Sequence, residues 1–170
     1  MIHYLVAIYY RIIILINDLF NTSIYKKIKN EYQAIQLGKK HNYVSGSNVY
    51  FGKYLNEKVI IKGFDIFNLY KNEINILNIL NQSNFVPGIL KVSKKYFIEE
   101  YVDGQTFDEY LKENMVNDKI LKQIIEYLDY LYSYKIVHRD IRPENIIINR
   151  ENIKVIDYGC AIKVDNNSFK

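Results

Sequence analysis

The chain has 170 residues, 49% of them apolar and 25% charged, and this composition is typical of one globular domain with its own core. A formal net charge of +4 is too small to favour nucleic-acid binding, but it is compatible with anionic partners such as nucleotides. The single cysteine, Cys160, excludes an internal disulfide and favours a reducing cytoplasm, and no CxxC or HExxH pattern indicates a zinc site.

Residues 1–38 are predicted to form a helical extension. Residues 5–16 are almost wholly apolar, and residues 23–37 carry apolar side chains at near-helical spacing. The apolar run is short for a membrane span, and Arg11 near its middle costs about 2.5–3.5 kcal/mol in a bilayer. It also lacks the basic start and the cleavage site of a signal peptide. We expect a helix packed on the domain; the alternative is a surface helix that gives the protein a peripheral membrane location.

From residue 42 the pattern changes to short β-prone runs separated by turn-forming residues. The predicted strands are, in chain order, residues 43–44, 49–51, 59–61, 89–92, 96–98, 146–148 and 154–156. Turns are predicted at residues 45–48 and 55–57, and Pro87 with Gly88 breaks the chain before a hairpin.

Three further helices are predicted. Asp65 is the expected N-cap of a helix that runs to about Leu80. Thr106 and Glu109 form a capping-box pattern that opens a short helix. A longer helix begins at Asp118 and carries an apolar stripe with a period near 3.6 residues, formed by Leu121, Ile124, Ile125, Leu128 and Leu131.

The polar loop at residues 138–145 carries the strongest chemical signal. Asp140 and Asn145 lie between a predicted helix and a strand, so both side chains can point into one cleft. Asp157 ends the following strand and can face the same cleft. Carboxylate and amide oxygens suit Mg²⁺, which keeps water and substrate phosphates as its other ligands. These residue types predict a nucleotide–metal site, because phosphoryl transfer needs metal ligands, a carboxylate near the acceptor hydroxyl and nearby cations.

Residues 138–145 read His-Arg-Asp-Ile-Arg-Pro-Glu-Asn, and Asp157-Tyr158-Gly159 begins twelve residues after Asn145. This order and spacing resembles the catalytic loop and the metal-binding triplet of the protein kinases. The resemblance extends back to the strand that ends in Lys62, to Glu73 on the predicted helix, and to residues 97–104, which look like the hinge between kinase lobes.

The resemblance implies a role for each matched residue of the loop and triplet. Asp140 would accept or orient the proton of the acceptor hydroxyl. Arg142 stands where serine/threonine kinases usually carry lysine and would meet the γ-phosphate. Asn145 and Asp157 would hold Mg²⁺. The cofactors implied are therefore ATP and Mg²⁺.

The resemblance also implies which residues bind the nucleotide. They are Lys62 and Glu73, the loop residues Gly46 and Ser47, and the hinge residues Glu100 and Val102. Lys62 would contact the α- and β-phosphates, and Glu73 would orient Lys62. The phosphate loop departs from the family pattern, because its three glycine positions fall on Asn42, Val44 and Ser47, with Gly46 between the last two.

The implied fold is α+β and bilobal, with the helical extension at residues 1–38 followed by one kinase-like domain at 39–170. A small antiparallel sheet with one helix would form the N-lobe, about residues 39–100, and an abbreviated helical C-lobe would follow at about 101–170. No activation segment follows the triplet, so we expect the N-terminal helix, a partner protein or a dimer mate to cover the helix at 118–134.

The implied activity is transfer of the γ-phosphate of ATP to a hydroxyl, with serine or threonine of a protein as the favoured acceptor. A sugar hydroxyl is the alternative acceptor, because the lipopolysaccharide kinases have similarly short loops. A pseudokinase that binds nucleotide or a partner protein without turnover is a third interpretation. No nucleic-acid partner is expected.

Overall fold

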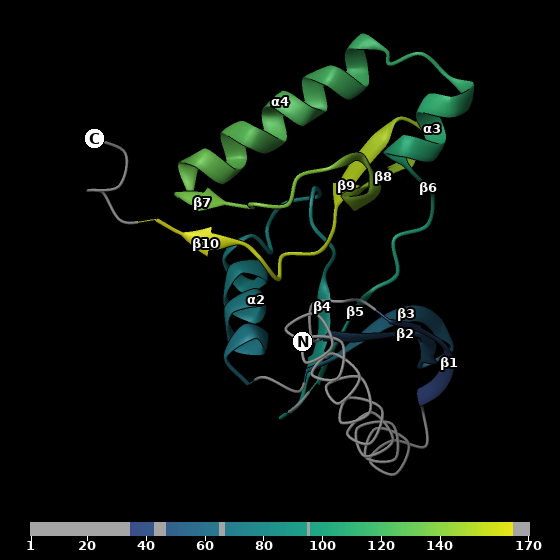
Figure 1. Cartoon of the computed structure of the whole chain (residues 1–170), viewed down its shortest axis with the longest axis vertical. Helices are drawn as coiled ribbons and strands as arrows, with labels where there is room; N and C mark the ends of the chain where they lie inside the picture. Colours follow the sequence, from purple (N-terminus) through teal and green to yellow (C-terminus); the bar gives the residue numbers. More distant parts are fainter. Residues whose placement is uncertain (1–34, 43–46, 65–66, 95, 165–170) are drawn as a thin grey trace, which may run out of the picture. The chain divides into compact units, whose positions relative to one another are not determined.

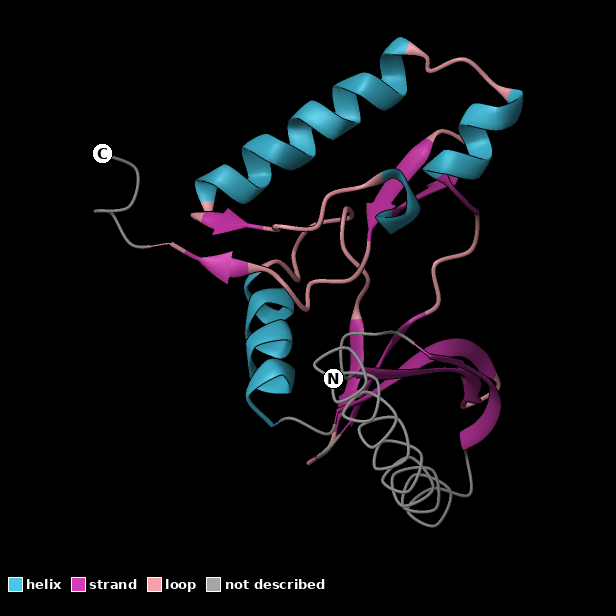
Figure 2. Cartoon of the chain, in the orientation of Figure 1, coloured by secondary structure: helices cyan, strands magenta, loops and turns pink. Residues whose placement is uncertain are grey.

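The computed structural model describes residues 35–42, 47–64, 67–94 and 96–164, and it mixes helices with strands (Figure 2). The structure confirms the predicted α+β class, because the described residues form both helices and strands. The described chain divides into two compact units. The first contains the residues up to 67 together with 91–98, and the second contains residues 68–90 and those from 99 onwards.

A five-stranded sheet dominates the first unit, with the strand order β1-β2-β3-β5-β4 (Figure 1). Its strands are β1 (Ile35–Asn42), β2 (Ser47–Tyr54), β3 (Glu57–Phe64), β4 (Ile89–Val92) and β5 (Tyr96–Glu100). β2 pairs antiparallel with both β1 and β3. Leu55 and Asn56 join β2 to β3 with φ angles of 51° and 70°, as a tight two-residue hairpin turn requires. The buried core cluster of the sheet consists of Tyr50, Val59, Ile61, Tyr96 and Ile98.

Two boundaries predicted from the sequence are wrong. The helical extension cannot reach residue 38, because Ile35–Asn42 forms β1 and pairs with β2. The turn predicted at residues 45–48 is wrong at its end, where Ser47 and Asn48 belong to β2. In both places pairing with a neighbouring strand overrides the local pattern. The remainder of the extension, with the apolar run at 5–16, lies outside the described residues, and among the described residues no helix is long and apolar enough to cross a bilayer.

The second unit combines helices with two small sheets. Its helices are α2 (Phe67–Ile79), α3 (Phe107–Glu113) and α4 (Asp118–Ser133), with a 3₁₀ turn at Pro143–Asn145. Its strands are β6 (Gln105–Thr106), β7 (Ile136–Val137), β8 (Ile146–Asn149), β9 (Asn152–Val155) and β10 (Ile162–Lys163). β8 pairs with β6 and β9, and β10 pairs with β7. The three predicted helices are present, and Asp65, the expected N-cap of the first, lies outside the described residues. The Thr106 amide donates to Glu109 at 3.0 Å, as the capping box requires.

Helix α4 buries only part of the apolar stripe that the sequence predicts. Leu121, Ile125 and Leu128 belong to the predicted stripe, yet they are 47%, 59% and 45% exposed. The buried positions are Ile120, Tyr127 and Leu131, and of these only Leu131 belongs to the predicted stripe. Because α4 packs beside the β8–β9 hairpin (Figure 1), the face that meets β9 is the buried one.

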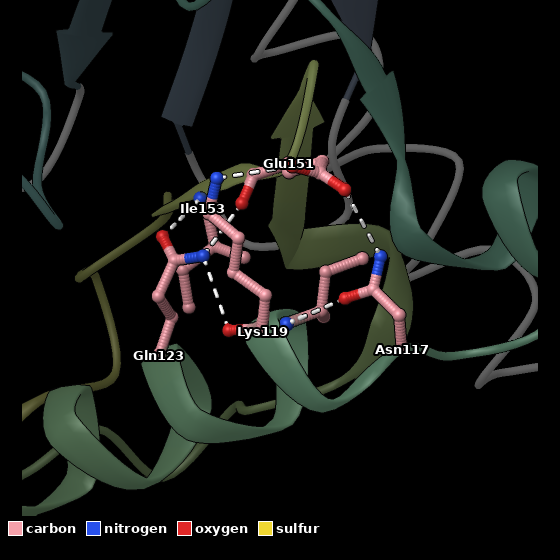
Figure 3. Close-up of polar contacts among 6 residues, drawn as sticks. Asn117, Lys119, Gln123, Glu151 and Ile153 are labelled. Carbon is pink, nitrogen blue, oxygen red and sulfur yellow. Dashed lines mark hydrogen bonds and ion pairs between the residues drawn. The ribbon is translucent and has the colours of Figure 1, made fainter.

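A polar cluster at the β8–β9 turn fixes the start of α4 (Figure 3). Asn117 is the N-cap, and its Oδ1 accepts a hydrogen bond from the Ile120 amide at 2.9 Å. Lys119 Nζ lies 3.0 Å from Glu151 Oε2, and the amide nitrogen of Gln123 donates to the Glu151 carbonyl. These contacts tie the helix to the hairpin that follows the polar loop.

We expect Asn117→Ala to lower the free energy of unfolding by about 1 kcal/mol, because the helix loses the acceptor for one of its first amides. Thermal unfolding followed by circular dichroism measures the change. Asn117→Ser is the control, since serine supplies an acceptor oxygen at the same position. An equal loss of stability in both variants would contradict the capping role.

Candidate active site

The polar loop between β7 and β8 is organised around Asn145. Asn145 is 5% exposed, and its Nδ2 donates to the Asp140 carbonyl at 3.0 Å and to Asp140 Oδ2 at 2.9 Å. Because both neighbours of the amide nitrogen are acceptors, the orientation of the amide is determined. The amide oxygen accepts no hydrogen bond from the described residues and is available to a cation.

Asp140 is held from three directions within the loop. Its backbone amide donates to His138 Nδ1 at 3.3 Å, its Oδ2 accepts from Asn145, and Arg142 Nε lies 3.9 Å from that same oxygen. Arg142 lies equally far from Glu144 Oε2, and its side chain is 51% exposed. Solvent screens a cation in this position, so Arg142 can move toward another anion at little cost.

Asp157 lies beside Asn145 because the β8–β9 hairpin returns the chain to the loop. The amide of Ile156 donates to the Asn145 carbonyl at 2.9 Å, one residue before Asp157. Asp157 has a φ of 65°, in the left-handed region that few side chains other than glycine and asparagine or aspartate adopt.

Asn145 and Asp157 together fit a magnesium ion. They offer one amide oxygen and one carboxylate, both hard ligands, and Mg²⁺ commonly uses one or two carboxylates plus phosphate and water. Within the described residues there is no cluster of three or more His, Cys, Asp and Glu side chains that could enclose a metal without such additional ligands.

The chain that follows Asp157 is fastened to its surroundings by four groups of contacts. Arg139 Nε donates to the Cys160 carbonyl at 2.8 Å, and Asn72 Nδ2 of α2 donates to the Ala161 carbonyl at 2.7 Å. β10 pairs with β7, and the amide of Val164 donates to the carbonyl of Lys135 at 2.8 Å. The residues around the triplet are therefore ordered by contacts within the second unit.

Glu73 on α2 lies close to Gly159, the last residue of the triplet. It is 1% exposed, and its Oε2 lies 3.8 Å from the point that a Cβ at Gly159 would occupy. Asp157 Oδ1 lies 3.4 Å from the same point. Helix α2 thus places a buried carboxylate close to the end of the triplet.

Lys62 lies on β3 of the first unit, opposite Val49 of β2. It is 7% exposed, and its Nζ lies 5.7 Å from the centroid of the Phe97 ring. A lysine this deeply buried is uncommon, since the ammonium group must be compensated by polar or aromatic neighbours. Of the two predicted loop residues, Ser47 begins β2 and Gly46 lies outside the described residues.

The two predicted hinge residues lie at the end of β5 and just beyond it. The amide of Glu100 donates to the Gly88 carbonyl at 2.9 Å, while its carboxylate accepts from the Gly88 amide and from Lys154 Nζ, the latter at 2.6 Å. Glu100 and Val102 line a cavity of about 800 Å³ together with residues of α4, residues of the β8–β9 hairpin, and Asn84, Phe85 and Asp103. The side chain of Glu100 is thus occupied by contacts within the second unit.

A comparison with known families decides what this arrangement is. Residues 23–170 match the family described as the protein kinase domain. The chain belongs to this family.

The similar proteins are named as protein kinases, and one of the three described here is named as a serine/threonine-protein kinase. The kinase domain is 36% identical over 114 residues to the MAP kinase kinase kinase SSK2 of Saccharomyces cerevisiae, covering 62% of this chain and 7% of that protein. It is 31% identical over 137 residues to the CBL-interacting serine/threonine-protein kinase 10 of Arabidopsis thaliana, covering 70% and 29%. It is 29% identical over 127 residues to the carbon catabolite-derepressing protein kinase of Candida glabrata, covering 69% and 21%. The chain therefore spans less than a third of each of these relatives.

Sequence reasoning missed one buried polar cluster of this kinase domain. Tyr158 of the triplet and Tyr127 of α4 are 0% and 1% exposed, and their hydroxyl oxygens are 3.1 Å apart. The His138 ring packs against Tyr158 with a centroid distance of 4.6 Å. Burial raises the pKa of both tyrosines, and the Glu99 carboxylate adds to the rise in the pKa of Tyr158, so both hydroxyls stay protonated. The only signal in the sequence is that Tyr127 lies four residues before Leu131, which predicts an ordinary core aromatic.

Proposed function

We propose that this chain is an ATP- and magnesium-dependent phosphotransferase that transfers the γ-phosphate to a hydroxyl, with protein serine or threonine as the acceptor. The observation that supports it most directly is the loop in which Asn145 fixes Asp140 and Asp157 lies alongside. We also propose the bilobal architecture of the family, with the sheet in the N-lobe and a helical C-lobe.

In this proposal the residues of the loop and the triplet hold the metal, position the acceptor and contact the γ-phosphate. Asn145 and Asp157 hold Mg²⁺, which offsets the charge of the phosphates when it is bound. Asp140 orients the acceptor hydroxyl and takes its proton, since its second carboxylate oxygen has no hydrogen-bond donor among the described residues. Arg142, which is exposed and weakly paired, meets the γ-phosphate with its planar fork of donors.

The remaining predicted residues bind the nucleotide. Lys62 contacts the α- and β-phosphates and Glu73 orients it, and the burial of both side chains supports these roles. Backbone groups of Gly46 and Ser47 cradle the phosphates, while backbone groups of Glu100 and Val102 read the adenine edge. The engagement of the Glu100 side chain by Gly88 and Lys154 supports a backbone role for this residue.

A protein acceptor is favoured because the relatives named above include a serine/threonine-protein kinase of Arabidopsis thaliana. The acceptor is tested directly, with casein as a generic protein acceptor and a lipopolysaccharide core sugar as the competing one.

The test is the melting temperature of the full chain with ATP, measured with excess Mg²⁺ and with EDTA. We expect ATP with Mg²⁺ to raise the melting temperature more than ATP with EDTA, because a ligand that binds only the folded state stabilises it by mass action. Asp157→Ala should reduce the shift with Mg²⁺ to the shift with EDTA. Transfer of labelled γ-phosphate to casein then separates an enzyme from a binding module.

Each result assigns the chain to one class. A magnesium-dependent shift with transfer supports the phosphotransferase, and a shift without transfer supports the pseudokinase. Transfer to the sugar alone replaces the protein acceptor. The absence of any shift in the wild-type chain contradicts the proposal as a whole.

A further inference from the structure

The hydroxyl groups of Tyr127 and Tyr158 satisfy each other inside the second unit. Their oxygens are 3.1 Å apart, and the described residues supply no other hydrogen-bond partner for either hydroxyl. Removing one hydroxyl of such a pair leaves the other buried and unsatisfied, whereas removing both leaves nothing unsatisfied. The two hydroxyls therefore form a single hydrogen bond between α4 and the triplet, and removing either hydroxyl breaks it.

Asp157 depends on its neighbour Tyr158 for its conformation. A residue with a φ of 65° is held there by its surroundings, since the left-handed region is unfavourable for a side chain with a Cβ. Tyr158 is 0% exposed, packs on His138, and its carbonyl accepts from the Ala161 amide at 3.0 Å. A displacement of the Tyr158 backbone is transmitted to Asp157 through the planar peptide bond that joins them.

We infer that Tyr127 is a positioning residue for the metal site: its hydroxyl keeps Tyr158 buried and thereby keeps Asp157 beside Asn145. Tyr127 itself lies on the buried face of α4, where its ring packs against Phe85 and its hydroxyl meets Tyr158. The inference rests on the proposed function in one respect, because it takes Mg²⁺ to be the ligand of Asp157.

This inference differs from a purely structural role in a measurable way. If the two tyrosines only fill space, phenylalanine at either position keeps the rings and leaves the metal site unchanged. If the hydroxyl pair positions Asp157, each single phenylalanine variant is impaired and the double variant recovers, a non-additivity expected only for directly coupled groups.

The first measurement is the affinity of the full chain for ADP by calorimetry, with excess Mg²⁺ and with EDTA. The ratio of the two dissociation constants is the magnesium gain. We expect Tyr127→Phe and Tyr158→Phe each to lower this gain by about 5- to 30-fold, the factor that corresponds to one unsatisfied buried hydroxyl. The double variant should return to within about threefold of the wild type. Tyr132→Phe, on the same helix but 72% exposed, is the control and should change nothing.

The second measurement needs no nucleotide. Hydrogen exchange at the Ala161 amide reports on Tyr158, because that amide donates to the Tyr158 carbonyl. Its protection should fall by a similar factor of about 5–30 in either single variant and recover in the double variant, while the Ile120 amide at the start of α4 is unaffected.

These measurements keep the inference separate from the proposed function. A wild-type chain that does not bind ADP refutes the proposed function, and the exchange at Ala161 then decides whether Tyr127 holds Tyr158. An unchanged magnesium gain with unchanged exchange in the single variants overturns the inference. If a single variant does not fold, the double variant decides alone, because a magnesium gain lost in a chain without unsatisfied hydroxyls contradicts the role of the pair.

Discussion

Replacing Asp140 by asparagine should slow phosphoryl transfer by about 10²–10⁴-fold, the contribution typical of a general base. The variant keeps the loop intact, since the amide oxygen at position 140 can still accept the hydrogen bond from Asn145 Nδ2. What it loses is the ability to take a proton. The rate of transfer of labelled phosphate from ATP to casein measures the loss, and the affinity for ADP with Mg²⁺ should stay within about threefold, equivalent to less than 1 kcal/mol.

Glu144→Gln is the matched control for this prediction. Glu144 lies as far from Arg142 as Asp140 does, 3.9 Å in each case, and its side chain is 54% exposed. Since an exposed ion pair is worth at most about 1 kcal/mol, transfer by Glu144→Gln should stay within about fivefold of the wild type. If both variants lose transfer equally, the loss comes from the charge balance around Arg142 rather than from a base at position 140.

The proximity of Asn145 and Asp157, the proposed metal ligands, could be predicted from the sequence because a single hairpin connects them. β8 and β9 occupy residues 146–155 and return the chain to its starting point, so Asn145 and Asp157 come together through local structure. Spacing along the sequence is then a reliable guide to distance in space. The positions of Asp140 and Asn145 follow for the same reason, since five residues separate them.

Features that depend on long-range contacts could not be predicted. β7 and β10 have two residues each and exist only because segments 25 residues apart, such as Val137 and Ile162, pair with each other. The hairpin that packs on α4 decides which apolar residues of the helix are buried, and its position does not follow from the periodicity of the helix alone. The hydroxyl contact between Tyr127 and Tyr158 spans 31 residues and has no signature in either segment.

Gly104→Ala should be the most destabilising single methyl addition among the glycines with described surroundings. Gly104 has a φ of 140°, which a side chain rarely adopts, and an added Cβ would collide with the backbone carbonyl of Ile148. Neither the backbone of β8 nor the turn that precedes β6 can move without breaking the pairing of β6 with β8. We expect a loss of about 3 kcal/mol, or roughly 6–12 °C in melting temperature for a chain of this size, measured by thermal unfolding.

Gly88→Ala is the matched control, because the nearest atom to its added Cβ is Glu100 Oε2 at 3.9 Å, an ordinary contact. Its stability should change by less than about 1 kcal/mol. If Gly104→Ala is as stable as Gly88→Ala, the backbone at position 104 is free to rearrange and the pairing of β6 with β8 is not rigid. If it is destabilised as expected, the backbone that leads from the predicted hinge residues into α3 is fixed by contact with β8, the strand that begins directly after Asn145.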